Sequence, residues 1–191
     1  MCLVCNRSSI AMQDEVRRWF ELNAVKAAAS LGTGLSHFAN MASQFELADH
    51  LGADTSVCIE EGKKALEVLD STRALYAENV MIAREHALDP GVASKLERTK
   101  LSAREMGFTG TEEQWEELLA LLKKDSVAGL FGKMHKQVKE LQEDLGTMIK
   151  ELEQGKMIGD RFGPYIAKWH DLLRTGHYGG RVYASLGGAK K

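Results

Sequence analysis

The chain has 191 residues, enough for one domain, and its 27 acidic and 25 basic residues give a net charge of −2. This near balance excludes a nucleic-acid-binding protein that relies on a broad basic face. The sequence contains no run of about 20 apolar residues that would span a bilayer, and its N-terminus lacks the pattern of a secretory signal. With only three cysteines, the composition favours a cytoplasmic protein with reduced thiols.

Proline is nearly absent, since Pro90 and Pro164 are the only two in the chain. Proline breaks helix interiors, so a chain this poor in it can carry very long helices. No stretch alternates apolar and polar residues for long, as a half-buried strand would. The sequence therefore predicts an all-α protein.

The first two predicted helices run from about Met12 to His50 and from about Thr55 to Leu88. Each carries apolar residues at steps of three and four, which is the pattern of one buried helix face. Gly52 is a plausible left-handed cap between them, and Asp54 or Thr55 caps the second helix. The first stripe is Val16, Phe20, Ala27, Leu31, Leu35, Phe38, Ala42 and Phe45; the second is Cys58, Gly62, Ala65, Leu69, Thr72, Tyr76, Val80, Ala83 and Ala87.

A third arm is expected over residues 92–124, interrupted by the turn signal Gly107 to Thr111, after which Thr111 and Gln114 form a capping box. The fourth arm, over residues 127–152, is the most regular. It repeats apolar residues for nearly four heptads, with Lys and Glu pairs at i,i+4 on the solvated side. Its stripe is Val127, Phe131, Met134, Val138, Leu141, Leu145, Met148 and Leu152.

The last part of the chain changes character after Gly155. Gly163-Pro164 predicts the start of a short helix. Residues 176–191 contain five of the protein's 18 glycines, which predicts an extended tail. We therefore expect a helical bundle domain over residues 1–175, with a flexible segment over residues 1–11, followed by the Gly-rich tail.

Four long arms joined by short turns predict an elongated antiparallel four-helix bundle, with the short helix packed across one end or along a groove. In this arrangement helix four starts at the Gly52 end of the bundle. We call the position of a residue along the bundle axis its level. Residues on adjacent helices at the same level are predicted to be neighbours.

Two groups of residues are candidate metal sites for zinc or iron. At one end, Cys2 and Cys5 have the spacing of a zinc or redox pair, and His86 comes close by the same stacking. The structural alternative is a terminal segment with two small apolar side chains.

At the other end, Glu46, His50, Cys58 and His135 offer hard, borderline and soft ligands together. The alternative is that Cys58 is a small core residue and that His50 complements the dipole of the helix C-terminus.

A flat cofactor such as haem is a further possibility. His37, Phe38, Met41, Tyr76 and Met81 have similar predicted levels near the middle of the bundle. Met and aromatic residues at helical spacing also form ordinary cores.

The standard catalytic and nucleotide-binding motifs are missing, among them HExxH, GxSxG, GxGxxG and the Walker loop. The tail carries apolar anchors that suit docking as an extended peptide: Tyr178, Val182, Tyr183 and Leu186. These features favour a non-enzymatic helical interaction or scaffold protein that self-associates or docks a protein partner. The alternative is a bundle that binds a metal or haem-type cofactor as a sensor, carrier or oxidoreductase.

Overall fold

The computed structural model describes residues 3–52, 54–85, 111–113, 115–117, 120, 127–156 and 158–175. Four long helices make up most of these residues: α1 (Leu3–Leu51), α2 (Ser56–Glu85), α5 (Val127–Glu153) and α6 (Gly159–Leu173). The described ranges contain no strand, so the prediction of an all-α bundle is confirmed. Within them, no helix has both the length and the apolar character that crossing a membrane requires.

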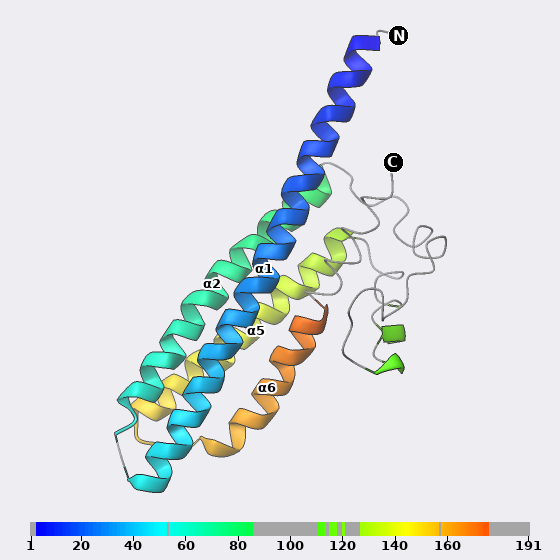
Figure 1. Ribbon diagram of the computed structural model, residues 1–191. Helices are drawn as coiled ribbons and strands as arrows, with labels where there is room; N and C mark the ends of the chain where they lie inside the picture. Colours follow the sequence, from blue (N-terminus) through cyan, green and yellow to red (C-terminus); the bar gives the residue numbers. More distant parts are fainter. Residues whose placement is uncertain are drawn as a thin grey trace.

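The helices pack side by side along their lengths (Figure 1). α1 and α2 form a hairpin, α5 packs on α2, and α6 packs against both α1 and α5. α6 thus lies lengthwise along the bundle, which is one of the two positions expected for the short C-terminal helix. Most of the third predicted arm, residues 92–124, lies outside the described residues, so the place of that arm in the bundle stays a prediction.

Side-chain contacts fix the direction of each helix. Asn79 Nδ2 donates to the Phe20 carbonyl at 3.3 Å and Cys58 Sγ to the Met41 carbonyl at 3.3 Å, so α1 and α2 are antiparallel. The Phe131 ring lies 5.0 Å from that of Phe20. α5 therefore starts near the C-terminal end of α2, and the prediction that helix four starts at the Gly52 end is wrong. Hydrophobic periodicity defines a helix face but does not define the helix direction.

The turns follow the chemistry of their residues. Gly52 and Gly155 have positive φ values of 63° and 71°, as glycines that close helices commonly do. The Asp54 carboxylate accepts a hydrogen bond from the Ser56 backbone N–H at 3.1 Å, as predicted for a residue that begins α2. Hydrogen bonds from Ser56 also lower the pKa of Asp54.

Two helix starts differ from the prediction. α1 begins at Leu3, well before Met12, because residues 3–11 contain neither proline nor glycine to stop it. The backbone of residues 3–11 is thus helical. α6 begins at Gly159 and includes Pro164. Pro164 lacks only the N–H that would bond to Asp160, and both residues are exposed, so water can satisfy the Asp160 carbonyl.

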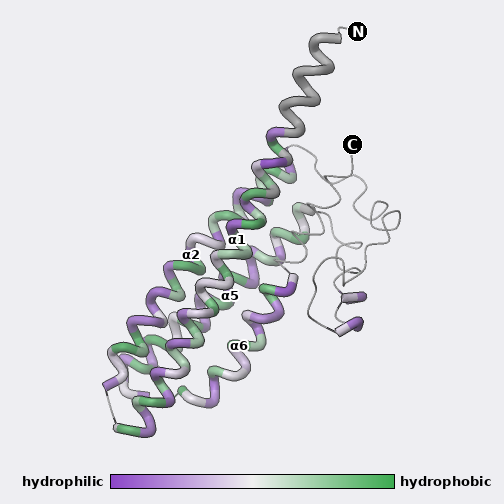
Figure 2. The backbone as a smooth tube through the Cα atoms, viewed as in Figure 1, coloured by the Kyte–Doolittle hydropathy of each residue, from purple (hydrophilic) through white to green (hydrophobic). Residues whose placement is uncertain are grey.

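The predicted stripes form the core between the helices, and residues of contrasting hydropathy alternate along each helix (Figure 2). Of the fourth stripe, all seven residues from Phe131 to Leu152 are buried. The predicted i,i+4 pairs Lys136–Glu140 and Lys139–Glu143 are also present on the solvated side, at 3.7 and 3.5 Å.

An aromatic cluster joins α1 to α6. The Phe38 ring centroid lies 4.4 Å from that of Tyr165 and 6.5 Å from that of Trp169. Gly34 lets the Trp169 ring approach the α1 backbone, because a Cβ atom at residue 34 would lie 2.6 Å from Trp169 Cη2. This contact allows α6 to pack closely on α1.

Candidate functional site

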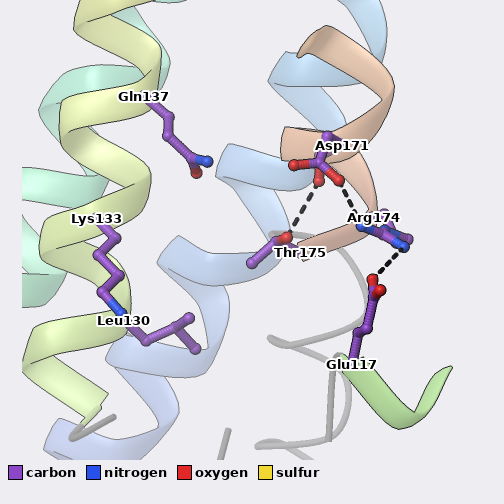
Figure 3. Close-up of a pocket in the computed structure, with 7 residues that line it drawn as sticks. All are labelled: Glu117, Leu130, Lys133, Gln137, Asp171, Arg174 and Thr175. Atoms are coloured by element: carbon purple, nitrogen blue, oxygen red, sulfur yellow. Dashed lines mark hydrogen bonds and ion pairs between the residues drawn. The ribbon is translucent and has the colours of Figure 1, made fainter. Parts of the chain in front are cut away.

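A small groove opens between α5, the C-terminal end of α6 and Glu117 (Figure 3). α5 contributes three residues at helical steps of three and four; α6 contributes Asp171, and Arg174 and Thr175 directly follow the end of α6. The groove has a volume of about 180 Å³. Its lining residues are Glu117, Leu130, Lys133, Gln137, Asp171, Arg174 and Thr175.

The charges in this groove largely satisfy one another. Arg174 forms an ion pair with the Asp171 carboxylate, and its Nη1 lies 3.7 Å from Glu117 Oε2. Thr175 Oγ1 donates to the Asp171 carbonyl at 3.1 Å. Ligand pockets usually measure about 300–1,000 Å³, so this groove offers room for a small polar molecule at most. An incoming anion would have to compete with two carboxylates for Arg174.

The first candidate metal group lies outside the described part of the chain. Cys2 and His86 fall in ranges that are not described. Cys5 lies in α1, but only the backbone of α1 is described at this residue. The proposal of a site formed by Cys2, Cys5 and His86 stays a prediction.

The structure does not bring the second candidate group together. Glu46 and His50 are exposed on the last turns of α1, whereas Cys58 is buried. His135 follows Met134 on the first half of α5, one turn beyond Phe131, and therefore lies toward the opposite end of the bundle. Within the described residues, no three His, Cys, Asp or Glu side chains form a group that could hold a metal ion.

Cys58 has the environment of a core residue. Its thiol donates to the Met41 carbonyl, and burial raises its pKa to about 11. A thiol with a raised pKa is a poor nucleophile and a poor metal ligand at neutral pH. The structural interpretation of Cys58 is therefore the one that the geometry supports.

The residues considered for a flat cofactor are divided between different environments. Phe38 packs in the aromatic cluster with α6, whereas the Tyr76 ring contacts Phe131 at 5.8 Å. Met81 is exposed on α2. His37 lies beside the core, and its Nδ1 is 2.8 Å from Glu61 Oε2.

The pair of His37 and Glu61 is an interhelical contact that sequence reasoning missed. Lys64 Nζ also contacts Glu61, at 2.7 Å. The hydrogen bonds from Lys64 and then His37 hold the pKa of Glu61 at about 2. The signal for this pair in the sequence is the predicted apposition of the first two helices, but the hydrophobic pattern alone does not pair His37 with Glu61.

An outward-facing row on α1 is the second feature that sequence reasoning missed. We call this row the outer face of α1. Its residues follow steps of four and three and are all exposed: Glu15, Trp19, Leu22, Lys26, Ala29, Thr33 and Ser36. Trp19 is 54% exposed and Leu22 50%, and the neighbouring Val25 is 55% exposed. These three large apolar side chains lie within two turns of one helix.

The predicted docking residues of the tail, Tyr178, Val182, Tyr183 and Leu186, lie outside the described residues. Comparison with known proteins adds no relative: the chain matches no family model, no curated protein and no solved structure. The geometry of the described residues is therefore the basis for the functional argument.

Proposed function

We propose that this protein is a non-enzymatic helical interaction protein, in which the bundle is the scaffold and the outer face of α1 is the contact surface. The observation that carries the proposal is the exposure of Trp19, Leu22 and Val25 on neighbouring turns of α1. Scattered exposed apolar residues are normal, but aromatic residues are enriched at protein interfaces, and tryptophan is common among the residues that dominate binding.

The rest of the described surface gives less support to a ligand-binding function. The groove near Arg174 is small, and its charged groups are engaged with one another. The core between the helices is filled by the predicted stripes and by the aromatic cluster around Phe38. A contact between helices requires neither a cavity nor a catalytic group.

Sedimentation velocity of the full chain over a range of concentrations tests this proposal. We expect the wild-type protein to associate and Leu22→Gln to weaken the association. Leu47→Gln is a matched control, because Leu47 is also on α1 and is 53% exposed but lies near the Gly52 end. A wild-type protein that stays monomeric, with a Leu22→Gln variant that behaves identically, would contradict the proposal.

A further inference from the structure

The outer face of α1 has the spacing of a coiled-coil contact. Glu15, Trp19, Leu22 and Lys26 alternate steps of four and three, which is the spacing of a and d positions in a heptad. All four side chains are exposed. The hairpin contact with α2 uses a different row of α1, since Ser30 and His37 make its hydrogen bonds. The heptad row is therefore available to a second helix.

We propose that this second helix is α1 of another copy of the chain, packed antiparallel, with Trp19 of each copy against Leu22 of the other. The inference rests on the proposed function and names its partner. A two-fold axis then passes between Trp19 and Leu22, so each contact occurs twice. The same register places Glu15 of each copy opposite Lys26 of the other, which gives two ion pairs that flank the apolar centre.

Charge selects the antiparallel orientation over the parallel one. Two parallel copies in register would place Glu15 against Glu15 and Lys26 against Lys26, and like charges at facing positions are unfavourable. In the described part of the chain, neither Glu15 nor Lys26 forms an ion pair with a residue of its own copy. Both charges are therefore available to the second copy.

The length of α1 fits the same register. The backbone of residues 3–14 continues as a helix beyond the described end of α2 (Figure 1). In the antiparallel pair, residues 5–12 of one copy lie opposite residues 29–36 of the other. Ala29, Thr33 and Ser36 have small side chains there, which allow a close approach of two helices.

The hydroxyl groups on this stretch are already satisfied. Thr33 Oγ1 donates to the Ala29 carbonyl at 3.3 Å, and Ser36 Oγ donates to the Gly32 carbonyl at 3.1 Å. A partner helix can cover them without leaving a buried donor unpaired, which would otherwise be costly. Residues 5–12 of each copy can thus pack on residues 29–36 of the other copy without leaving these hydroxyl groups unpaired.

Charge reversal tests the register in the full chain. Glu15→Lys alone and Lys26→Glu alone each place like charges opposite one another at two positions. Because each reversal replaces two attractive charge pairs with two repulsive ones, it should raise the dimer Kd roughly tenfold. The double variant Glu15→Lys/Lys26→Glu restores both pairs, and its Kd should return to within about threefold of wild type. Both residues are exposed, and thermal unfolding by circular dichroism checks that each variant is folded.

Cysteine cross-linking tests the orientation in a background where Cys2 and Cys5 are replaced by serine. Under mild oxidation, Glu15→Cys mixed with Lys26→Cys should form a disulfide-linked dimer, and neither variant alone should do so. Cross-linking of each variant alone would overturn the antiparallel arrangement. If Leu22→Gln weakens association but the double charge reversal gives no rescue, the register is wrong and the proposed function stands. If Leu22→Gln has no effect, the proposed function itself fails.

Discussion

The contact between Gly34 and Trp169 allows a quantitative test of how α6 packs on α1. A Cβ atom at residue 34 would lie 2.6 Å from Trp169 Cη2 and 3.2 Å from Val68 Cγ1. Gly34→Ala therefore forces a buried ring to move, and overpacking of this kind costs roughly 1–3 kcal/mol. The same substitution removes a flexible glycine from a helix interior, which is worth about 0.5–1 kcal/mol. The net effect should be a loss of roughly 0–2.5 kcal/mol of unfolding free energy.

Gly32 provides a matched control on the same helix. A Cβ atom at residue 32 would have no neighbour within 4 Å. Gly32→Ala should therefore raise the free energy of unfolding by about 0.5–1 kcal/mol. The helix-propensity gain is common to both variants, so their difference isolates the clash and should be roughly 1–3 kcal/mol.

Urea unfolding followed by circular dichroism measures this difference, with the m-value checking that the unfolded state is unchanged. Trp169→Phe supplies a second check, because a smaller ring leaves room for the new Cβ atom. In that background Gly34→Ala should cost less than in the wild type, and the double-mutant cycle gives the coupling. The reasoning is refuted if Gly34→Ala stabilises the protein as much as Gly32→Ala does.

Three further predictions follow from buried and paired groups. Tyr76→Phe removes a buried hydroxyl that has no partner among the described residues and should leave stability unchanged or raise it by about 1 kcal/mol. The Tyr165 hydroxyl donates to a backbone carbonyl at 2.5 Å, so Tyr165→Phe should lower the stability by about 1 kcal/mol. Equal losses of stability for the two variants in thermal unfolding would contradict the difference expected between them. Because the pKa of Glu61 is lowered to about 2, its charge stabilises the fold above the ordinary pKa near 4.5, and this stabilisation is lost as the pH falls toward 2. Glu61→Gln should thus be less stable than wild type at pH 7, with the gap closing across that range, and Glu60→Gln should show a smaller gap throughout. The Cys58 thiol, with its pKa raised to about 11, should resist alkylation at pH 8 in the native state and react after unfolding; rapid labelling of the folded protein, located by mass spectrometry, would count against its burial.

The fourth predicted arm shows what the sequence determines by itself. From Phe131 to Leu152 its apolar residues recur without interruption, and charged pairs occupy the other side, so only one face can be buried. The end of this helix at Gly155 is also visible in the sequence, because glycine tolerates the positive φ that closes it.

The direction of this helix and its neighbours could not be predicted in the same way. Placing His135 near Cys58 required helix four to start at the Gly52 end, and no residue within the helix carries that information. Because the Phe131 ring contacts the Phe20 ring, α5 starts at the end of the bundle opposite to the predicted one. His135 therefore lies away from Cys58. The candidate metal group therefore failed through topology, although each of its residues was assigned to a helix correctly.

The outer face of α1 was missed for a different reason. The predicted stripe of this helix includes Phe20 and leaves out Trp19 and Leu22, and single apolar residues outside a stripe are common on exposed helix faces. The structure separates them: Phe20 is fully buried, and Trp19 and Leu22 point outward. A helix with apolar residues on two sides has a weak one-sided pattern, and that weakness is itself a sequence signal of a second contact surface.

The inner side of the same turns supports this interpretation of α1. Asn23 on α1 and Asn79 on α2 are both buried. Asn23 Nδ2, Asn79 Oδ1 and the Tyr76 hydroxyl have no hydrogen-bond partner in the described part of the chain. Buried polar atoms without partners cost free energy, and this level of the α1–α2 contact is more polar than the level of Met41, where the Cys58 thiol donates to the backbone. The large apolar side chains lie on the outside of this level. A second helix on the outer face would bind the folded hairpin and not the unfolded chain, so it would stabilise the folded state.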